Sequence, residues 1–155
     1  MQKQYRLNVA AIVLSSKYPD KCEFFVALRS DIKNAWQFPQ GGIDKAETPK
    51  EALLRELLEE IGTNNIDIIS EYPEWITYDF PKLVAPRMHP YSGQTQKYFL
   101  VRLRDNNNIN LNWQDIPEFE KYQFVTYQEL MQKASYLKRS VYKRVIDHFI
   151  KEGYI

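Results

Sequence analysis

The sequence predicts one α/β domain built from layers of strands and helices. Strand-like apolar runs and amphipathic helical patterns interleave along the chain, as expected for a sheet covered by helices. The 155 residues suffice for one domain that buries about 68–70% of the surface of its unfolded chain. The contents of 44% hydrophobic and 26% charged residues are those of an ordinary globular protein. We therefore expect residues 1–155 to form a single domain.

Six segments have the composition of β-strands, with apolar and β-branched residues bounded by polar or turn-forming ones. The clearest alternation places Tyr98 and Leu100 on one side of a strand and Phe99 and Val101 on the other. The six predicted strands are residues 8–15, 23–28, 66–70, 74–80, 96–104 and 122–126.

The first helix is predicted by the residues at its two ends. Thr48 and Glu51 have the spacing of a capping box, and Pro49 occupies a position where the first turn tolerates proline. Gly62 suits the left-handed conformation that ends many helices. The apolar stripe expected to face the core consists of Leu53, Leu54, Leu57, Leu58 and Ile61.

Two further helices are expected in the C-terminal part of the chain. Thr126 and Glu129 repeat the capping-box spacing at the start of the second. The third should run over about residues 140–151. Its expected buried residues are Val141, Val145, Ile146, Phe149 and Ile150. Residues 81–93 contain three prolines and form the longest irregular segment, which is either a functional loop or a passive connection.

Composition constrains the partners and the compartment. The chain has 21 Lys and Arg against 20 Asp and Glu, so the net charge of +1 neither favours nor excludes a nucleic-acid partner. Cys22 is the one cysteine, which excludes an intrachain disulfide and is typical of a reducing cytoplasm. No apolar run approaches the roughly 18 residues of a membrane span. We therefore expect a cytoplasmic protein without a membrane partner.

Three carboxylates share one face of the first predicted helix. Glu56, Glu59 and Glu60 stand at positions i, i+3 and i+4, where like charges destabilise a helix. Such a cluster alone is most often a solvated surface. It is also the oxygen-rich arrangement that a hard cation prefers, and a bound cation would relieve the repulsion.

The wider spacing around this cluster decides between the two interpretations. Residues 41–63 read GGIDKAETPKEALLRELLEEIGT and contain the pattern G-x5-E-x7-R-E-apolar-x-E-E-x-G. The fixed positions are Gly41, Glu47, Arg55, Glu56, Glu59, Glu60 and Gly62. This pattern resembles the signature of the Nudix hydrolases, which cut diphosphate linkages with the help of divalent metal. Thr63 departs from it, because the family has an aliphatic residue there.

The resemblance implies a fold, a cofactor and roles for the signature residues. The fold would be an α/β/α sandwich with a mixed β-sheet between helices. The cofactor would be Mg²⁺ or Mn²⁺, both of which favour oxygen ligands. Arg55 would pair with Glu47 and orient the catalytic helix. The metal ligands would be the carboxylates of Glu56, Glu59 and Glu60 and the backbone carbonyl of Gly41.

Segments outside the signature resemble the bacterial RNA pyrophosphohydrolases and their dinucleoside polyphosphate hydrolase relatives. They are residues 5–9, 36–43, 75–78, 93–100, 117–119 and 138–145. The resemblance implies removal of phosphates from 5′-triphosphate or 5′-diphosphate RNA, leaving a 5′-monophosphate that primes mRNA for decay. The alternative activity is hydrolysis of diadenosine tetraphosphate and related dinucleotides. A non-catalytic module that senses nucleotides is the alternative from another functional class.

The same resemblance implies that further residues belong to the candidate site. Glu118 would be a fourth metal-binding carboxylate, and either Glu56 or Glu118 would be the general base. The expected substrate contacts are Arg6, Tyr78, Leu137, Lys138 and Arg139. Leu137 stands where the subfamily has an aromatic residue, which would stack on a base. Lys138 and Arg139 are expected to lie just ahead of the third helix.

Overall fold

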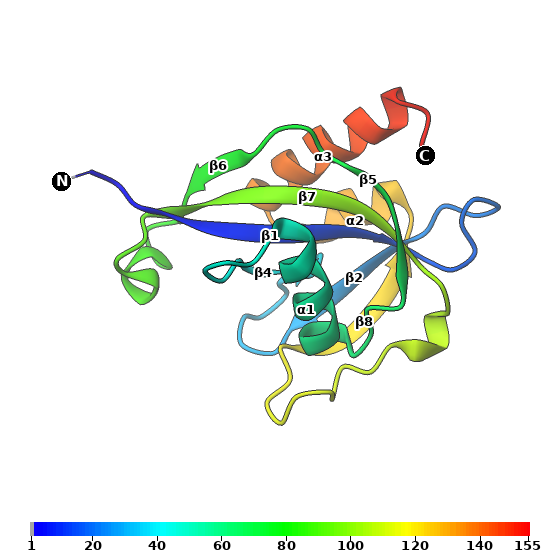
Figure 1. Cartoon of the computed structure of the whole chain (residues 1–155), viewed down its shortest axis with the longest axis horizontal. Coiled ribbons are helices and arrows are strands. Elements are labelled where there is room, and N and C mark those ends of the chain that lie inside the picture. The colour runs from blue at the N-terminus through cyan, green and yellow to red at the C-terminus, as the bar shows by residue number, and fades with distance from the viewer. Residues whose placement is uncertain (1) are drawn as a thin grey trace.

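The long central strands of the chain lie side by side in parallel, and this pair organises the fold. In the computed structural model, which describes residues 2–155, eight strands form one mixed sheet (Figure 1). Strand β1 (Tyr5–Leu14) pairs in parallel with β7 (Gly93–Leu103) along its whole length, from Tyr5 opposite Gly93 to Leu14 opposite Arg102. The other pairings in this sheet are antiparallel.

The remaining strands extend this pair on both sides. The main order is β3-β2-β1-β7-β5, with β4 on β1, β6 on β7 and β8 on β2. Their bounds are β2 (Phe24–Arg29), β3 (Trp36–Gln37), β4 (Gln40–Gly42), β5 (Ile66–Glu71), β6 (Ile76–Asp79) and β8 (Phe119–Val125). All six predicted strands are confirmed. Strands β3 and β4 were not expected, because two or three residues carry no measurable alternation.

The first two helices begin where their capping residues predicted. Helix α1 (Pro49–Ile61) has a complete capping box between Thr48 and Glu51, and it ends at Gly62 with a φ of 75°. Helix α2 (Tyr127–Lys133) has the same box between Thr126 and Glu129.

Helix α3 (Tyr136–Lys151) corrects two expectations. It begins four residues before the expected start, after Ser135, so Lys138 and Arg139 lie in its first turn and not ahead of it. Ile150 is 48% exposed and does not belong to the buried stripe, whereas Tyr142 is buried there. In α1, Leu54 was also expected to face the core, but it is exposed.

The helices cover both faces of the sheet, which confirms the α/β/α sandwich. Alternate residues of β1 point to opposite sides, so that Ile12 joins one hydrophobic cluster and Val13 the other. The first cluster includes residues of α3, among them Val145 and Phe149, while the second includes Leu53 of α1. Figure 1 shows α1 in front of the sheet, with α2 and α3 behind it.

Two short 3₁₀ helices lie in the connections. One, η1 (Ala85–Met88), interrupts the irregular segment 81–93, and the other is η2 (Asn106–Asn108). Among residues 2–155, no helix is both long and apolar enough to cross a lipid bilayer.

Candidate active site

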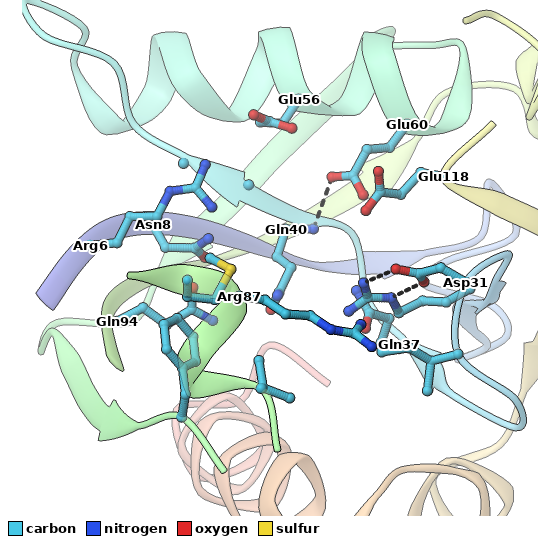
Figure 2. Close-up of a pocket in the computed structure, with 17 residues that line it drawn as sticks. Arg6, Asn8, Asp31, Gln37, Gln40, Glu56, Glu60, Arg87, Gln94 and Glu118 are labelled. Carbon is cyan, nitrogen blue, oxygen red and sulfur yellow. Dashed lines mark hydrogen bonds and ion pairs between the residues drawn. The ribbon is translucent and has the colours of Figure 1, made fainter. Parts of the chain in front are cut away.

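A cavity of about 420 Å³ opens beside α1 over the first halves of β1 and β7 (Figure 2). This volume lies within the range of small-molecule sites. Five parts of the chain contribute its walls: the sheet floor, helix α1, the connection after β2, the segment around η1 and the residues just before β8. The site is therefore assembled from segments that are distant in sequence.

One wall of the cavity is acidic. Glu56 and Glu60 project from α1, and Glu118 reaches the same space from the connection before β8 (Figure 2). The Glu60 side chain is almost fully buried, and its Oε1 accepts a hydrogen bond from the backbone N–H of Gln40 at 3.1 Å. Its other oxygen, Oε2, is buried without a hydrogen-bond partner. An unpaired buried carboxylate oxygen is costly, which indicates that a ligand belongs there.

Two carboxyl groups of the acidic wall have raised pKa values. Burial, then the negative charges of Glu56 and Glu118, raises the pKa of Glu60 well above its usual value. Burial also raises the pKa of Glu56, although the neighbouring Arg55 opposes this shift. Both carboxylates therefore favour an additional positive charge at this wall.

Arg55 links the acidic residues behind this wall. Its Nε and Nη2 donate to the two oxygens of Glu47 at 2.7 and 2.9 Å, and its Nη1 donates to Glu56 at 2.8 Å. Nη2 also donates to the carbonyl of Gly42 at 2.8 Å, which ties α1 to β4. Glu59 lies 3.3 Å from Nη1, and its side chain is 37% exposed and absent from the cavity lining. One guanidinium thus fixes the position of three carboxylates.

The opposite side of the cavity is basic. Arg6, Arg29 and Arg87 line it, and Figure 2 shows the Arg87 side chain reaching across the cavity toward Gln37. Arg29 is held by Asp31 through two hydrogen bonds of 2.9 and 2.8 Å. Of the three arginines, the sequence assigned a role only to Arg6. The sequence did not indicate Arg29 or Arg87 as site residues, because a single arginine at the end of a strand or in a loop forms no recognisable motif.

Side-chain amides form the floor between the two walls. The Gln96 Nε2 donates to Asn8 and to Gln40, each at 2.9 Å. Gln37 is 2% exposed, and its buried Oε1 has no hydrogen-bond partner. Gln94 completes the floor and donates to the hydroxyl of Tyr78. These amides were also missed, since glutamines in predicted strands do not signal a site by themselves.

The expected substrate residues lie at different distances from this cavity. Tyr78 does not line it, because its buried hydroxyl is taken up by Gln94. Lys138 lies close enough to Arg29 and Glu60 for both charges to affect its pKa. Arg139 donates to the carbonyl of Ala134 at 3.1 Å, which ties α3 to the end of α2. Leu137 is partly buried beside them and outside the cavity lining.

A divalent cation fits the acidic wall, as the unpaired Oε2 of Glu60 and the mutual repulsion of the carboxylates indicate. In the described part of the chain, no three His, Cys, Asp or Glu side chains gather closely enough to form a complete ligand set. This matches the chemistry of Mg²⁺, which commonly takes one or two carboxylates and fills its shell with waters and substrate phosphates.

The absence of side chains at Gly41 and Gly42 leaves room for two polar groups of the site where β4 passes under α1. A Cβ on Gly41 would overlap the carboxyl group of Glu56, and a Cβ on Gly42 would overlap the guanidinium of Arg6. Gly41→Ala should therefore displace Glu56 and lower kcat by about 10–100-fold, the range typical of disturbed ligand positioning. Steady-state hydrolysis with Mg²⁺ measures this. Gly153→Ala is the control: its Cβ meets nothing within 4 Å and lies outside the cavity lining, so the backbone strain at a φ of 83° should leave kcat unchanged.

The fold and the site together define a class of α/β sandwich proteins in which an acidic helix faces basic side chains across a cavity suited to phosphates and a cation. The family model described as "NUDIX domain" matches residues 4–149, and the chain belongs to this family.

The chain is also similar over its full length to curated relatives. It is 68% identical to a protein named RNA pyrophosphohydrolase from Sulfurovum sp. (strain NBC37-1), over 99% of this chain and 98% of that protein. It is 56% identical to a protein of the same name from Helicobacter pylori (strain HPAG1), over 100% of this chain and 99% of that one.

Solved structures of low sequence identity share the fold. The E. coli dihydroneopterin triphosphate pyrophosphohydrolase has a TM-score of 0.74 at 18% identity, covering 94% of this chain and 99% of its own. A C. elegans Ap4A hydrolase binary complex has a TM-score of 0.68 at 20% identity, covering 94% and 98%. Both likenesses support the layered architecture described above.

Proposed function

We propose that the chain is a metal-dependent RNA 5′ pyrophosphohydrolase that converts 5′-triphosphate or 5′-diphosphate ends to 5′-monophosphates and thereby primes mRNA for decay. The observation that carries the proposal is the single cavity in which an acidic wall faces three arginines. This arrangement suits a polyphosphate whose charge is shared between a cation and guanidinium groups. The full-length similarity to proteins named RNA pyrophosphohydrolase supports RNA as the phosphate carrier.

The residues divide into those that hold the metal and those that hold the substrate. The proposed ligands of Mg²⁺ or Mn²⁺ are drawn from Glu56, Glu59, Glu60 and Glu118 and the carbonyl of Gly41, with one or two carboxylates for each ion and the rest of its shell filled by waters and substrate phosphates. When bound, the ion supplies positive charge for the phosphate oxygens and favours deprotonation of the attacking water. Arg6, Arg29 and Arg87 bind the phosphate oxygens that face away from the acidic wall.

The attacking water must lose a proton to a nearby base. Glu56 is the first candidate, because it lines the cavity and burial raises its pKa toward the range that suits a general base. Glu118 is the second candidate, since it lines the same acidic wall beside Glu60. Arg55 and Glu47 act by positioning α1, because neither side chain lines the cavity, they bond to each other, and Arg55 ties α1 to the Gly42 carbonyl of β4.

One comparison tests the proposal. With Mg²⁺, kcat/KM is measured on a short 5′-triphosphate RNA and on diadenosine tetraphosphate. Faster hydrolysis of the RNA is expected, and much faster hydrolysis of the dinucleotide would reassign the chain to the dinucleoside polyphosphate hydrolases. Tight binding without cleavage of either substrate would support a nucleotide-sensing module instead. Repeating the measurement with Mn²⁺ establishes the preferred ion.

Lys138 should make substrate binding depend on pH. Burial, then the positive charge of Arg29, lowers the pKa of Lys138 to about 8, while Glu60 opposes the shift. The ammonium form that binds phosphate is therefore present below pH 8 and lost above it. We expect kcat/KM on triphosphate RNA to fall by about tenfold between pH 7 and 9, because a charge-assisted hydrogen bond contributes roughly 1.5–3 kcal/mol. Lys138→Arg cannot titrate in this range and should remove the decline; an identical decline in that variant would exclude Lys138 as its source.

A further inference from the structure

A second, basic hollow continues from the rim of the cavity. It has a volume of about 450 Å³, and Arg29 and Ile32 line both spaces. Lys33 and Lys121 lie in this second hollow, with Glu120 as its acidic residue. The two spaces therefore lie next to each other, with Arg29 and Ile32 between them.

The strand register places an aromatic ring and a lysine on the same face here. Leu28 of β2 lies opposite Trp36 of β3 on one side and opposite Lys121 of β8 on the other. Directly opposed residues point to the same face of a sheet, so the Trp36 ring and the Lys121 side chain stand together.

Two lysines are gathered around this ring. The Nζ of Lys133, from the last turn of α2, lies 4.5 Å from the centre of the Trp36 ring, and the Nζ of Lys121 lies 5.7 Å from it. The ring attracts both ammonium groups through its negative face. Among residues 2–155, no salt bridge involves Lys33, Lys121 or Lys133. The Trp36 ring thus holds Lys121 and Lys133, and the charges of all three lysines are available to an anionic partner.

We infer that this basic hollow, which Lys33 and Lys121 line, binds the phosphodiester backbone of the RNA downstream of its 5′ end, together with Lys133, which meets Lys121 at the Trp36 ring. The inference rests on the proposed function. A strand whose 5′ phosphates occupy the cavity must leave it over the rim, and the rim at Arg29 and Ile32 adjoins the hollow lined by Lys33 and Lys121. Cations that follow an extended strand are the usual means of sequence-independent binding to single-stranded RNA.

A competing exit lies at the other end of the cavity. Arg6 and Gly42 line both the cavity and a hollow that contains Lys45, Asp44 and Tyr91. Lys45 is the one lysine lining that hollow, whereas Lys33 and Lys121 both line the hollow beyond Arg29. The path past Lys121 and Lys133 is therefore the more favourable for a polyanion.

Substrate length tests the inference. We would measure kcat/KM on a triphosphorylated dinucleotide and on an unstructured triphosphate RNA of about a dozen nucleotides, a length within the usual span of single-strand sites. The variant is Lys121→Gln with Lys133→Gln, and Lys45→Gln is the matched control. Glutamine removes the charge without adding a carboxylate near Glu118.

The native protein should prefer the longer RNA, and this preference should shrink as salt rises. The double variant should lose on the order of tenfold in kcat/KM on the longer RNA at about 0.1 M salt, with a salt slope smaller by roughly 0.7 per lost contact. Its kcat/KM on the dinucleotide should be unchanged, which also shows that the fold is intact. Lys45→Gln should behave as the native protein.

Three results would overturn this inference. They are an equal length preference in the double variant, no length preference in the native protein, and loss of the preference in Lys45→Gln alone. Failure of the proposed function has a different signature, because the native protein would then leave even the triphosphorylated dinucleotide uncut.

Discussion

Glu60→Gln is expected to lower kcat by about three orders of magnitude and at the same time to raise the Tm of the metal-free protein. The loss of activity follows from removing a proposed metal ligand, since a bound cation contributes several kcal/mol to stabilisation of the transition state. The gain in stability follows from the environment of the side chain. Glu60 is 4% exposed, one of its oxygens has no partner, and its neighbours Glu56 and Glu118 are negative.

The stability gain should depend on pH in a defined direction. The pKa of Glu60 is raised in the folded protein above its ordinary value of 4.5. The folded state therefore prefers the protonated form, and the native protein loses stability as pH rises from 4.5 toward the raised pKa. The difference in Tm between variant and native protein should be absent below about pH 4 and largest at neutral pH. Each kcal/mol gained corresponds to about 2–4 °C in Tm for a chain of this size.

Thermal melts in EDTA across pH, together with kcat at saturating Mg²⁺, measure both effects. Glu59→Gln is the matched control, because its carboxylate is more exposed and bonded to Arg55. That variant should also lose activity as a proposed ligand, but without a rise in Tm. A Glu60→Gln protein with kcat within tenfold of the native value would remove Glu60 from the metal site.

The sequence predicted the helical part of the site well because local interactions determine it. The capping box at Thr48 and the left-handed Gly62 fix the ends of α1, and the resulting phase places Glu56 and Glu60 on one side. The start of α3 was wrong by four residues, since Tyr136 and Arg139 are exposed and give the first turn no apolar periodicity. Helix boundaries without a side-chain cap are poorly marked in sequence, and Ser135 makes no such capping bond.

The basic wall and the amide floor of the cavity could not be predicted, because both depend on contacts between segments distant in sequence. Arg87 enters the cavity only because the segment 81–93 brings η1 to its edge, and Gln37 does so only because the two-residue strand β3 pairs with β2. The available signal was the irregular proline-rich segment 81–93, which correctly indicated a loop but did not single out Arg87.

Arg55→Leu should combine a loss of stability with a loss of activity. Arg55 donates to Glu47, to Glu56 and to the Gly42 carbonyl, so its removal leaves carboxylates unpaired and loosens the contact between α1 and β4. Removing one partner of a buried ion pair costs roughly 3–5 kcal/mol, and the 30% exposure of this side chain reduces the expected cost to about 2 kcal/mol. We expect kcat/KM to fall by about 100-fold, as for other groups that orient metal ligands. Arg55→Lys should recover little, since an ammonium group cannot reproduce the two-oxygen contact with Glu47.

A second substitution distinguishes positioning by Arg55 from a general loss of packing. Arg55, then the backbone N–H of Asp44, lowers the pKa of Glu47 to about 2, so this pair stabilises the native protein above pH 4.5 and the contribution is lost as pH falls toward 2. Arg55→Leu should abolish that acid-dependent component of stability. Adding Glu47→Gln to Arg55→Leu should then restore part of the lost stability, because it removes the carboxylate left unpaired, without restoring kcat, because Glu56 remains unanchored. Urea unfolding of the single and double variants measures the coupling. Strictly additive losses in the free energy of unfolding would mean that the two side chains act independently. In that case the apolar contacts of α1 with the sheet would hold the helix in position.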